Sequence, residues 1–372
     1  MKTTKKLDAL TSLRFFAAAL IVVYHASPAF GVGEVPASFD QGVSFFFVLS
    51  GFILAYVYPR LDGGVQMLRF WQARIARIWP GHVFAFLLVL ALLPQAAWTI
   101  SGVPELAPAA ANLVMVHAWI PYLDYYYSFN SPSWSISTEF FFYLCFPLLL
   151  WRWHHTWLLK LAATLLIAIA IVAYCEIHDL PWAETEFKGV SSSALIYIHP
   201  LGRLFEFTLG MVAELAWESW LLFEIGAVEA TLLEGSVVVL ALASIAYGDD
   251  VAFFMQTWLD EPRHALAEWI IHSGSSLFFA ALVAVIAMQR GWLSRLLQWP
   301  LLVLLGEASF AIYLTHQIIL RRLVLSVQQL PAWPNWLWYG IYWALVLAVS
   351  LLVWRYVECP ARRFLGPGSA RL

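Results

Sequence analysis

The sequence is poor in charged residues: Asp, Glu, Lys and Arg together make up 12% of its 372 residues. Soluble domains carry about 25% charged residues, so this chain has roughly half the charge needed to cover a surface that faces water. Its formal net charge of −3 also offers no basic face to nucleic acid. A soluble enzyme, a disordered chain and a nucleic-acid-binding protein are therefore excluded as first interpretations.

Cysteine is equally scarce. Three residues, Cys145, Cys175 and Cys359, give no disulfide framework. No group of Cys and His has the spacing of metal ligands, so we expect no metal site.

Apolar side chains are abundant instead. They make up 62% of the residues, and the mean hydropathy is +0.74. The apolar runs are continuous and do not alternate as in the strands of a membrane β-barrel, and the 20 Trp and 15 Tyr suit two membrane–water interfaces. These features predict an all-α, polytopic membrane protein, with a single membrane-embedded domain over residues 1–372 and no soluble appended domain.

The number of crossings follows from segment length, because a spanning helix needs about 20 predominantly apolar residues. A secretory signal peptide is the alternative for the first segment, but Arg14 interrupts its apolar run. Ten segments qualify as spanning helices: 9–28, 41–58, 79–97, 134–152, 157–175, 200–217, 229–246, 267–288, 306–325 and 335–356.

An eleventh apolar stretch, 108–122, is short and contains His117 and Pro121. Ten crossings that start in the cytoplasm place most Lys and Arg on the cytoplasmic side, as positive-inside topology requires. A crossing by 108–122 would remove most of that bias. We therefore expect about ten transmembrane helices, both termini in the cytoplasm, and 108–122 as a re-entrant or interfacial piece.

Ionisable side chains within apolar segments are candidates for function, because a charge inside a membrane is costly. The set comprises Arg14, His25, Glu139, Arg203, Glu206, His272, Glu307 and His316.

Arg14 and His25 share the first segment. Eleven residues at about 100° each return to nearly the same face of a helix, and the two residues lie roughly 16 Å apart along its axis. Glu139, about five residues into its own segment, lies at a similar depth to His25. A carboxylate beside an imidazole orients a general base, so we predict a His25–Glu139 pair, with a helix-packing hydrogen bond as the simpler alternative.

A basic segment precedes the third apolar segment. Within it, Arg74 and Arg77 are i, i+3 on a probable helix and face the same way. Guanidinium groups suit phosphate, although positive-inside charge in contact with lipid headgroups explains the same residues. Arg203 and Glu206 have the same spacing, which predicts an ion pair near the outer mouth, either positioning a helix or contacting an acceptor.

Seven blocks carry a further signal because they occur in one order along the chain. They are the Arg-x10-His spacing of Arg14 and His25; GVSFFFVLSGFILA (Gly42–Ala55); RFWQARIARIWP with Arg74 and Arg77; SPSWSISTEFFFYLCFP with Trp134, Ser135 and Glu139; RLFEFTLGM with Arg203 and Glu206; GEASFAIYLTHQ with Gly306, Ser309, Tyr313 and His316; and VECPARRF with Glu358, Pro360 and Arg362. With these blocks the chain resembles the acyltransferase-3 family of integral membrane O-acyltransferases from about Leu7 to Leu365. Thr138 and Cys359 depart from the family pattern.

The resemblance implies a membrane O-acyltransferase that uses acyl-CoA, usually acetyl-CoA, as a co-substrate, with no permanently bound cofactor. The acceptor is a hydroxyl of a cell-envelope or secreted glycan, or of a lipid-linked sugar, across a bacterial cytoplasmic (inner) membrane. The expected partners are thus acyl-CoA, the glycan and membrane lipid, and no nucleic acid.

The implied site combines these residues. We expect Arg14, Arg74 and Arg77 to bind the donor, and His25 to act as general base with Glu139. Residues expected to contact the acceptor or to support the site are Ser50, Ser135, Arg203, Glu206, Tyr313 and His316.

Two other functions fit a polytopic chain. One is a proton-coupled secondary transporter with a His25/Glu139 relay, although the sequence indicates neither the broken helices nor the internal symmetry of such proteins. The other is a non-catalytic membrane scaffold, which would not need an Arg14–His25 pair on one face.

Overall fold

The computed structural model describes residues 6–103, 105–183, 189–221, 224–258, 264–326 and 333–367. These residues form helices, with no strand among them. The α-helices are α1 (Asp8–Ala29), α2 (Gly42–Val57), α3 (Gly64–Leu92), α4 (Leu106–Leu113), α5 (Leu123–Tyr126), α6 (Trp134–Leu150), α7 (Trp153–Ile177), α8 (Pro200–Trp220), α9 (Ala227–Ala246), α10 (Gly248–Trp258), α11 (His264–Ser273), α12 (Ser276–Ala287), α13 (Trp292–Leu297), α14 (Pro300–Glu307), α15 (Ser309–Ser326), α16 (Asn335–Val353) and α17 (Cys359–Leu365).

Short helices of other kinds connect several of them. The 3-10 helices are η1 (Ala37–Gln41), η2 (Gln95–Ala97), η3 (His117–Trp119) and η4 (Ser131–Ser133), and the π-helices are η5 (Ala194–Ile198) and η7 (Trp354–Glu358).

The prediction of an all-helical polytopic membrane protein is confirmed. Within the described residues, eight helices are long and apolar enough to cross a membrane, or nine if α14 and α15 form one broken span. The expected segment 200–217 is helical as α8 but is not among these nine, and it carries Arg203, Glu206 and Glu214, all buried inside the bundle. The cytoplasmic placement of both termini and the single domain over 1–372 stay predictions.

The third helix is longer than the sequence indicated. α3 begins at Gly64, not at residue 79, so the basic segment with Arg74 and Arg77 is the first half of the same helix. Pro80 lies inside α3, and a proline is tolerated in a membrane helix where neighbouring groups satisfy the freed carbonyl. The apolar-run criterion stopped at the arginines because it scores composition and not helix continuity.

One helix is broken, which the sequence analysis did not predict. α14 and α15 meet at an angle of 60°. Gly306 lies against α1 just before the break: a Cβ there would be 1.9 Å from the carbonyl oxygen of Thr11. Only glycine permits that approach, so the backbone of α14 contacts the start of α1 directly at Gly306.

The segment 108–122 is not a spanning helix, as expected. It contains most of α4 and all of η3, and it ends just before α5. α4 has eight residues and is therefore about 12 Å long, too short to cross a membrane.

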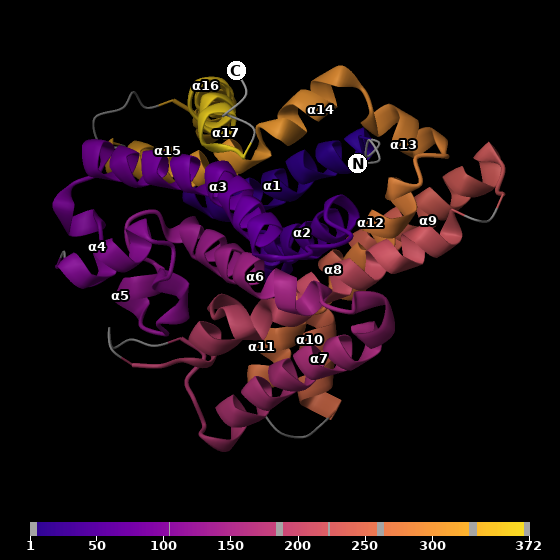
Figure 1. Ribbon diagram of the computed structural model, residues 1–372. Coiled ribbons are helices and arrows are strands. Elements are labelled where there is room, and N and C mark those ends of the chain that lie inside the picture. Colours follow the sequence, from indigo (N-terminus) through magenta and orange to yellow (C-terminus); the bar gives the residue numbers. More distant parts are fainter. Residues whose placement is uncertain are drawn as a thin grey trace.

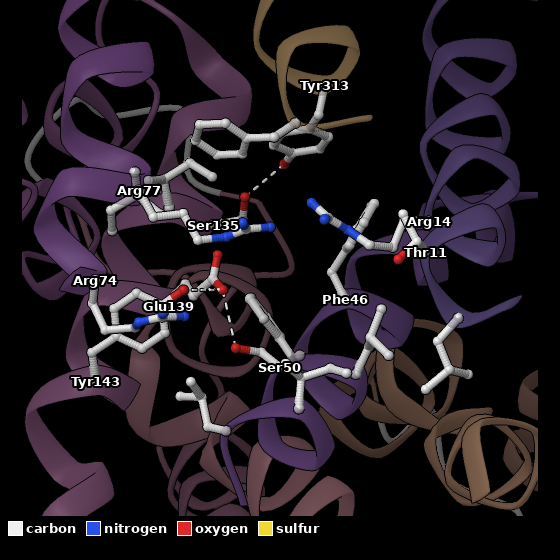
Figure 2. A pocket seen from close by; sticks show the side chains of 18 of the residues that line it. Thr11, Arg14, Phe46, Ser50, Arg74, Arg77, Ser135, Glu139, Tyr143 and Tyr313 are labelled. Atoms are coloured by element: carbon white, nitrogen blue, oxygen red, sulfur yellow. Dashed lines mark hydrogen bonds between the residues drawn. The ribbon is translucent and has the colours of Figure 1, made fainter. Parts of the chain in front are cut away.

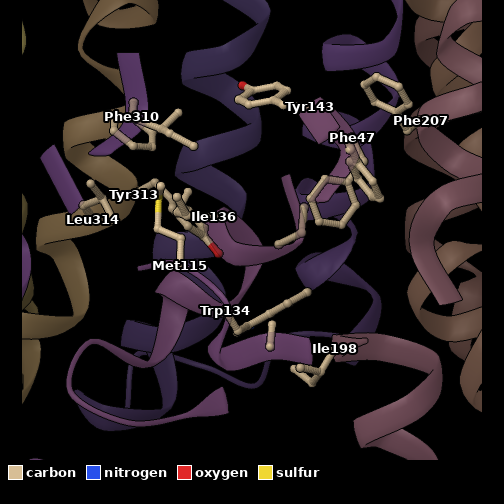
Figure 3. Packing of buried hydrophobic residues seen from close by; sticks show 14 of the residues in the cluster. Phe47, Met115, Trp134, Ile136, Tyr143, Ile198, Phe207, Phe310, Tyr313 and Leu314 are labelled. Carbon is tan, nitrogen blue, oxygen red and sulfur yellow. The ribbon is translucent and has the colours of Figure 1, made fainter. Parts of the chain in front are cut away.

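The centre of the bundle is the contact between α2 and α8 (Figure 1). A Cβ on Gly51 would be 1.9 Å from the carbonyl oxygen of Phe207, and a Cβ on Gly210 would be 1.9 Å from that of Val48. Small residues bring two membrane helices into such backbone contact. A large apolar cluster packs around this pair, and Figure 3 shows Phe47, Phe207 and Trp134 among its members.

Candidate functional site

A first cavity in the bundle is rich in arginine. It has a volume of about 360 Å³. Arg14 of α1 and Arg362 of α17 both line it, so the first and the last described α-helices contribute to the same cavity (both are labelled in Figure 1). The charged residues in its lining are Arg14, Arg74, Arg77, Arg362, Glu139 and Glu307.

The arginines expected at the donor site come together here. Figure 2 shows the side chains of Arg14 and Arg77 pointing toward one another from opposite sides of the cavity. The Arg74 guanidinium lies over the rings of Tyr58 and Tyr143, 5.5 and 5.9 Å from their centroids. Cation–π contacts of this kind hold a guanidinium in place while its N–H groups remain able to bind an anion.

Arg362 was expected only as part of the closing block. It forms an ion pair with Glu358 at 2.5 Å, one turn earlier in the chain, while lining the cavity. The closing segment of the chain thus adds a fourth guanidinium to the first cavity.

Glu139 lies in the first cavity and not beside His25. Its Oε1 atom accepts hydrogen bonds from Ser50 Oγ at 3.0 Å and from Tyr143 OH at 2.5 Å (Figure 2). The hydrogen-bonded His25–Glu139 pair expected from the sequence is not formed among the described residues. Depth along a helix fixes the height of a side chain but not its direction, and Glu139 shares its direction with Ser135 and Tyr143 at i−4 and i+4, which line the same cavity.

The second cavity lies at the other end of α1 and contains His25. It has a volume of about 480 Å³, and its described lining comes from the loops and helix ends around residues 21–43, 123–134, 182–183, 191–197 and 272, together with α15. α1 therefore sends Arg14 into one cavity and His25 into the other, three turns and roughly 16 Å apart.

His316, named only as a supporting residue, is the hydrogen-bond partner of His25. His25 Nδ1 and His316 Nε2 are 3.0 Å apart, and His316 Nδ1 is 2.7 Å from the carbonyl oxygen of Tyr313. A carbonyl oxygen only accepts, so His316 Nδ1 carries a proton and donates it. In neutral rings, His316 Nε2 then accepts from His25 Nδ1–H, and His25 Nε2 is left with a free lone pair. This tautomer is assigned from the geometry.

The two cavities meet at two residues, Val43 and Tyr313, which line both of them. The Tyr313 hydroxyl donates to the carbonyl oxygen of Pro132 at 2.8 Å and lies 2.7 Å from Ser135 Oγ. Ser135 and Tyr313, both expected at the site, thus form a hydroxyl pair at the junction, and Figure 2 shows it above Glu139.

Arg203 and Glu206 form the expected ion pair, at 3.2 Å, with 0% and 1% of their side chains exposed. Arg203 also donates to the carbonyl oxygen of His272 at 3.2 Å, and its guanidinium lies 5.4 Å from the centroid of Tyr197. Neither residue lines the first or the second cavity, so the acceptor contact is dropped. The pair supports Tyr197 and His272, which do line the second cavity.

Tyr127 and Tyr197 in the second cavity lie outside the spanning segments. Burial raises the pKa of both phenols, because an apolar environment disfavours the phenolate. Both hydroxyls therefore stay protonated and can donate hydrogen bonds.

Sequence reasoning missed Tyr143 and Asp40. Tyr143 is four residues after Glu139, and a second polar group at i+4 on an apolar helix is a readable signal. Asp40, in the second cavity, lies just before the apolar run that begins at residue 41, and so outside the segments in which ionisable residues were sought. Among the described residues, no group of His, Cys, Asp and Glu is arranged to hold a metal ion.

Comparison with known proteins gives one family. Residues 7–355 match the family model described as an acyltransferase domain. The chain is 29% identical over 336 residues to acyltransferase MdmB of Streptomyces mycarofaciens, covering 85% of this chain and 79% of that protein.

Two further relatives are more distant. Nodulation protein 10 of Rhizobium leguminosarum is 24% identical, with 94% of this chain and 92% of that protein covered. O-acetyltransferase OatA of Staphylococcus aureus is 22% identical, with 98% of this chain but 58% of that protein covered, so the chain spans little more than half of OatA. No solved structure matches.

Proposed function

Since this chain belongs to the acyltransferase-3 family as an integral membrane O-acyltransferase, we propose that it transfers acetyl from cytoplasmic acetyl-CoA to a glycan hydroxyl on the far side of the membrane. The observation that carries the proposal is the meeting of an arginine-rich cavity and a histidine-bearing cavity at Val43 and Tyr313. The membrane is proposed to be a bacterial cytoplasmic membrane, and the acceptor a cell-envelope or secreted glycan or a lipid-linked sugar.

The first cavity is assigned to the donor. The phosphates of CoA cannot enter hydrocarbon, and Arg14, Arg74 and Arg77 offer guanidinium groups at the cavity that α1 and α17 share. Guanidinium binds phosphate through paired N–H donors. The thin pantetheine arm then extends along α1 toward the junction, and the roughly 16 Å between the levels of Arg14 and His25 sets the length that the arm must cover.

Glu139 is assigned to the donor cavity and not to the orientation of the general base, His25. Its carboxylate, fixed by Ser50 and Tyr143, lies among the arginines and offsets part of their mutual repulsion when no donor is bound. This replaces the role expected from the sequence, in which Glu139 orients the imidazole.

His25 is assigned as the general base, and His316 as the residue that positions it. His25 Nε2 takes the proton of the acceptor hydroxyl while the hydroxyl oxygen attacks the thioester carbon. The C–S bond then breaks, and the proton held on Nε2 passes to the leaving CoA sulfur. His316 Nε2 stabilises the charged ring by accepting from His25 Nδ1–H throughout.

The hydroxyls of Ser135 and Tyr313 lie at the junction that the acetyl group has to pass. A hydrogen-bond donor at this place stabilises the negative charge that forms on the thioester oxygen as the acceptor hydroxyl adds to the thioester carbon. We assign this role to the pair, because both side chains are buried and lie at the junction. Both hydroxyls donate to the carbonyl oxygen of Pro132, so one of them has to turn its hydrogen from that carbonyl to the thioester oxygen when the donor arrives.

The test is acetyl transfer by the purified protein in lipid nanodiscs, with acetyl-labelled acetyl-CoA and a soluble oligosaccharide as acceptor probe. Labelled sugar is expected with wild type, and a loss of about 10²–10⁴-fold with His25→Ala. A His25→Ala variant that is folded and retains wild-type turnover contradicts the assignment of the base. Proton-coupled uptake of a solute by the protein, without any acetyl transfer, would favour the alternative function of a secondary transporter.

A further inference from the structure

The second cavity contains a buried carboxylate–imidazole pair that takes no part in the proton transfer described above. Asp40 Oδ2 lies 2.6 Å from His272 Nδ1, and the two residues are 4% and 8% exposed. The other carboxylate oxygen, Asp40 Oδ1, is buried and has no hydrogen-bond partner among the described residues. A buried carboxylate oxygen without a hydrogen-bond partner is costly. This atom is therefore a candidate to accept a hydrogen bond from a bound ligand.

The carboxylate is held rigidly. Asp40 belongs to η1, whose first two backbone N–H groups donate to Asp249 at 2.9 and 3.2 Å. The Ser38 hydroxyl in the same turn donates to the carbonyl oxygen of Ile245 at 2.6 Å. On the other side, the His272 ring stacks on Tyr197 with centroids 4.1 Å apart. Asp40 Oδ1 is therefore fixed before any ligand arrives.

The described walls around this atom are aromatic and hydroxylated. In the described lining, Asp40 is the only acidic residue, and neither Lys nor Arg is present. The aromatic residues are Tyr24, Tyr126, Tyr127, Trp134, Trp182, Tyr197 and Tyr313, and the other polar residues are His25, His272, Ser131, Ser191, Ser193 and Gln317.

We propose that this part of the second cavity is the acceptor subsite and that it selects an uncharged sugar ring, with Asp40 Oδ1 accepting a hydrogen bond from a ring hydroxyl. The inference rests on the proposed acyl transfer and names the chemistry of its acceptor. A sugar ring presents C–H faces, which pack on aromatic faces through the negative π cloud. Its hydroxyls donate to the carboxylate, as in ligand sites where a few fixed polar groups set orientation.

The same arrangement rejects anionic sugars. A uronate or a phosphorylated sugar would bring a second negative charge next to Asp40, with no Lys or Arg in the described lining to balance it. Like charges in a poorly solvated cavity repel strongly, and such a clash is an effective source of specificity. The arginines of the first cavity lie beyond the junction at Val43 and Tyr313.

The first test measures the binding of oligosaccharides directly, in the absence of acetyl-CoA. Purified wild-type protein in nanodiscs is titrated by calorimetry with cellotetraose, chitotetraose and tetragalacturonate. At least one of the two neutral oligosaccharides is expected to bind tenfold or more tighter than the uronate. Equal or tighter binding of tetragalacturonate, or no binding of either neutral sugar, overturns the proposal. This readout does not depend on acetyl transfer, so it separates a failure of the subsite from a failure of the proposed function.

The second test is kinetic. Asp40→Asn should raise the KM for the neutral oligosaccharide about tenfold or more, because it removes a charge-assisted hydrogen bond, and it should leave the KM for acetyl-CoA unchanged. Asp124→Asn is the matched control: its carboxylate accepts from the backbone N–H of Ser101 at 2.8 Å and does not line the cavity. An unchanged acceptor KM in folded Asp40→Asn refutes the role of this carboxylate.

His272 gives a second route if Asp40→Asn does not fold. The amide of His272→Asn can replace Nδ1 as the donor to Asp40 Oδ2, so its acceptor KM should stay near that of wild type. His272→Leu removes that donor and should raise the acceptor KM. Equal acceptor KM values for the two variants contradict a positioning role for His272.

Discussion

His316 offers the sharpest separation between a structural and a mechanistic role, because each of its ring nitrogens has one partner. Asn can place an amide near the position of Nδ1, and Gln can place one near that of Nε2. His316→Asn should therefore keep the contact with the Tyr313 carbonyl and lose the acceptor for His25. His316→Gln should keep an oxygen that accepts from His25 Nδ1–H.

The expected loss follows from the hydrogen bond at 3.0 Å. In the transition state the His25 ring is cationic, and a hydrogen bond to a charged group contributes about 1.5–3 kcal/mol. At about 1.4 kcal/mol per tenfold, His316→Asn should lower kcat roughly 10- to 150-fold. The KM for acetyl-CoA should not change, because His316 does not line the first cavity.

The assay is steady-state acetyl transfer in nanodiscs, with thermal unfolding of each variant as the control for folding. His316→Gln should retain most of the kcat that His316→Asn loses. A His316→Asn variant that turns over at the wild-type rate would refute the assignment of the His25 tautomer. So would equal losses in the two variants when both are folded.

Three further predictions concern the donor cavity and the packing around it. Replacing Arg74 and Arg77 together by Gln should raise the KM for acetyl-CoA and make it more sensitive to salt; a fall in kcat alone, measured in the same assay, would mark a transition-state role instead. Gly210→Ala should lower the thermal stability in detergent because its Cβ would lie 1.9 Å from a carbonyl oxygen of α2, whereas Gly235→Ala, which meets nothing within 4 Å, should not. Glu206→Gln should cost on the order of 3 kcal/mol of stability, since it removes one charge of a buried pair, with the KM values of both substrates little changed in the folded fraction; normal stability with a raised acceptor KM would restore the acceptor role.

Composition and spacing predicted the class of fold and a group of arginines that the structure brings together in the first cavity, although their role in donor binding stays a proposal. Continuous apolar runs and scarce charge are properties of the whole chain, so the fold class that they predict does not depend on how individual helices pack. Arg74 and Arg77 face the cavity because i, i+3 residues share a helix face, and this geometry is local. For the same reason the Arg203–Glu206 pair could be predicted from four consecutive residues.

The partner of His25 could not be predicted in this way. Glu139 and His316 are both polar residues in apolar helices, and nothing local says which of the two turns toward α1. That choice depends on how α6 and α15 rotate when they pack, and on the 60° break before α15, which begins at the close approach of Gly306 to α1. The contact between Asp40 and His272 could not be predicted, because the two residues are more than two hundred positions apart in the chain.

The central claim is that an acetyl group passes from one cavity to the other, and so from one side of the membrane to the other. Purified protein in sealed proteoliposomes tests it most directly, with acetyl-labelled acetyl-CoA added outside and a neutral oligosaccharide trapped inside. Labelled sugar is expected in the lumen of wild-type vesicles and is expected to be absent from the lumen of His25→Ala vesicles. Labelled sugar that forms only when the oligosaccharide and acetyl-CoA share one compartment would contradict it.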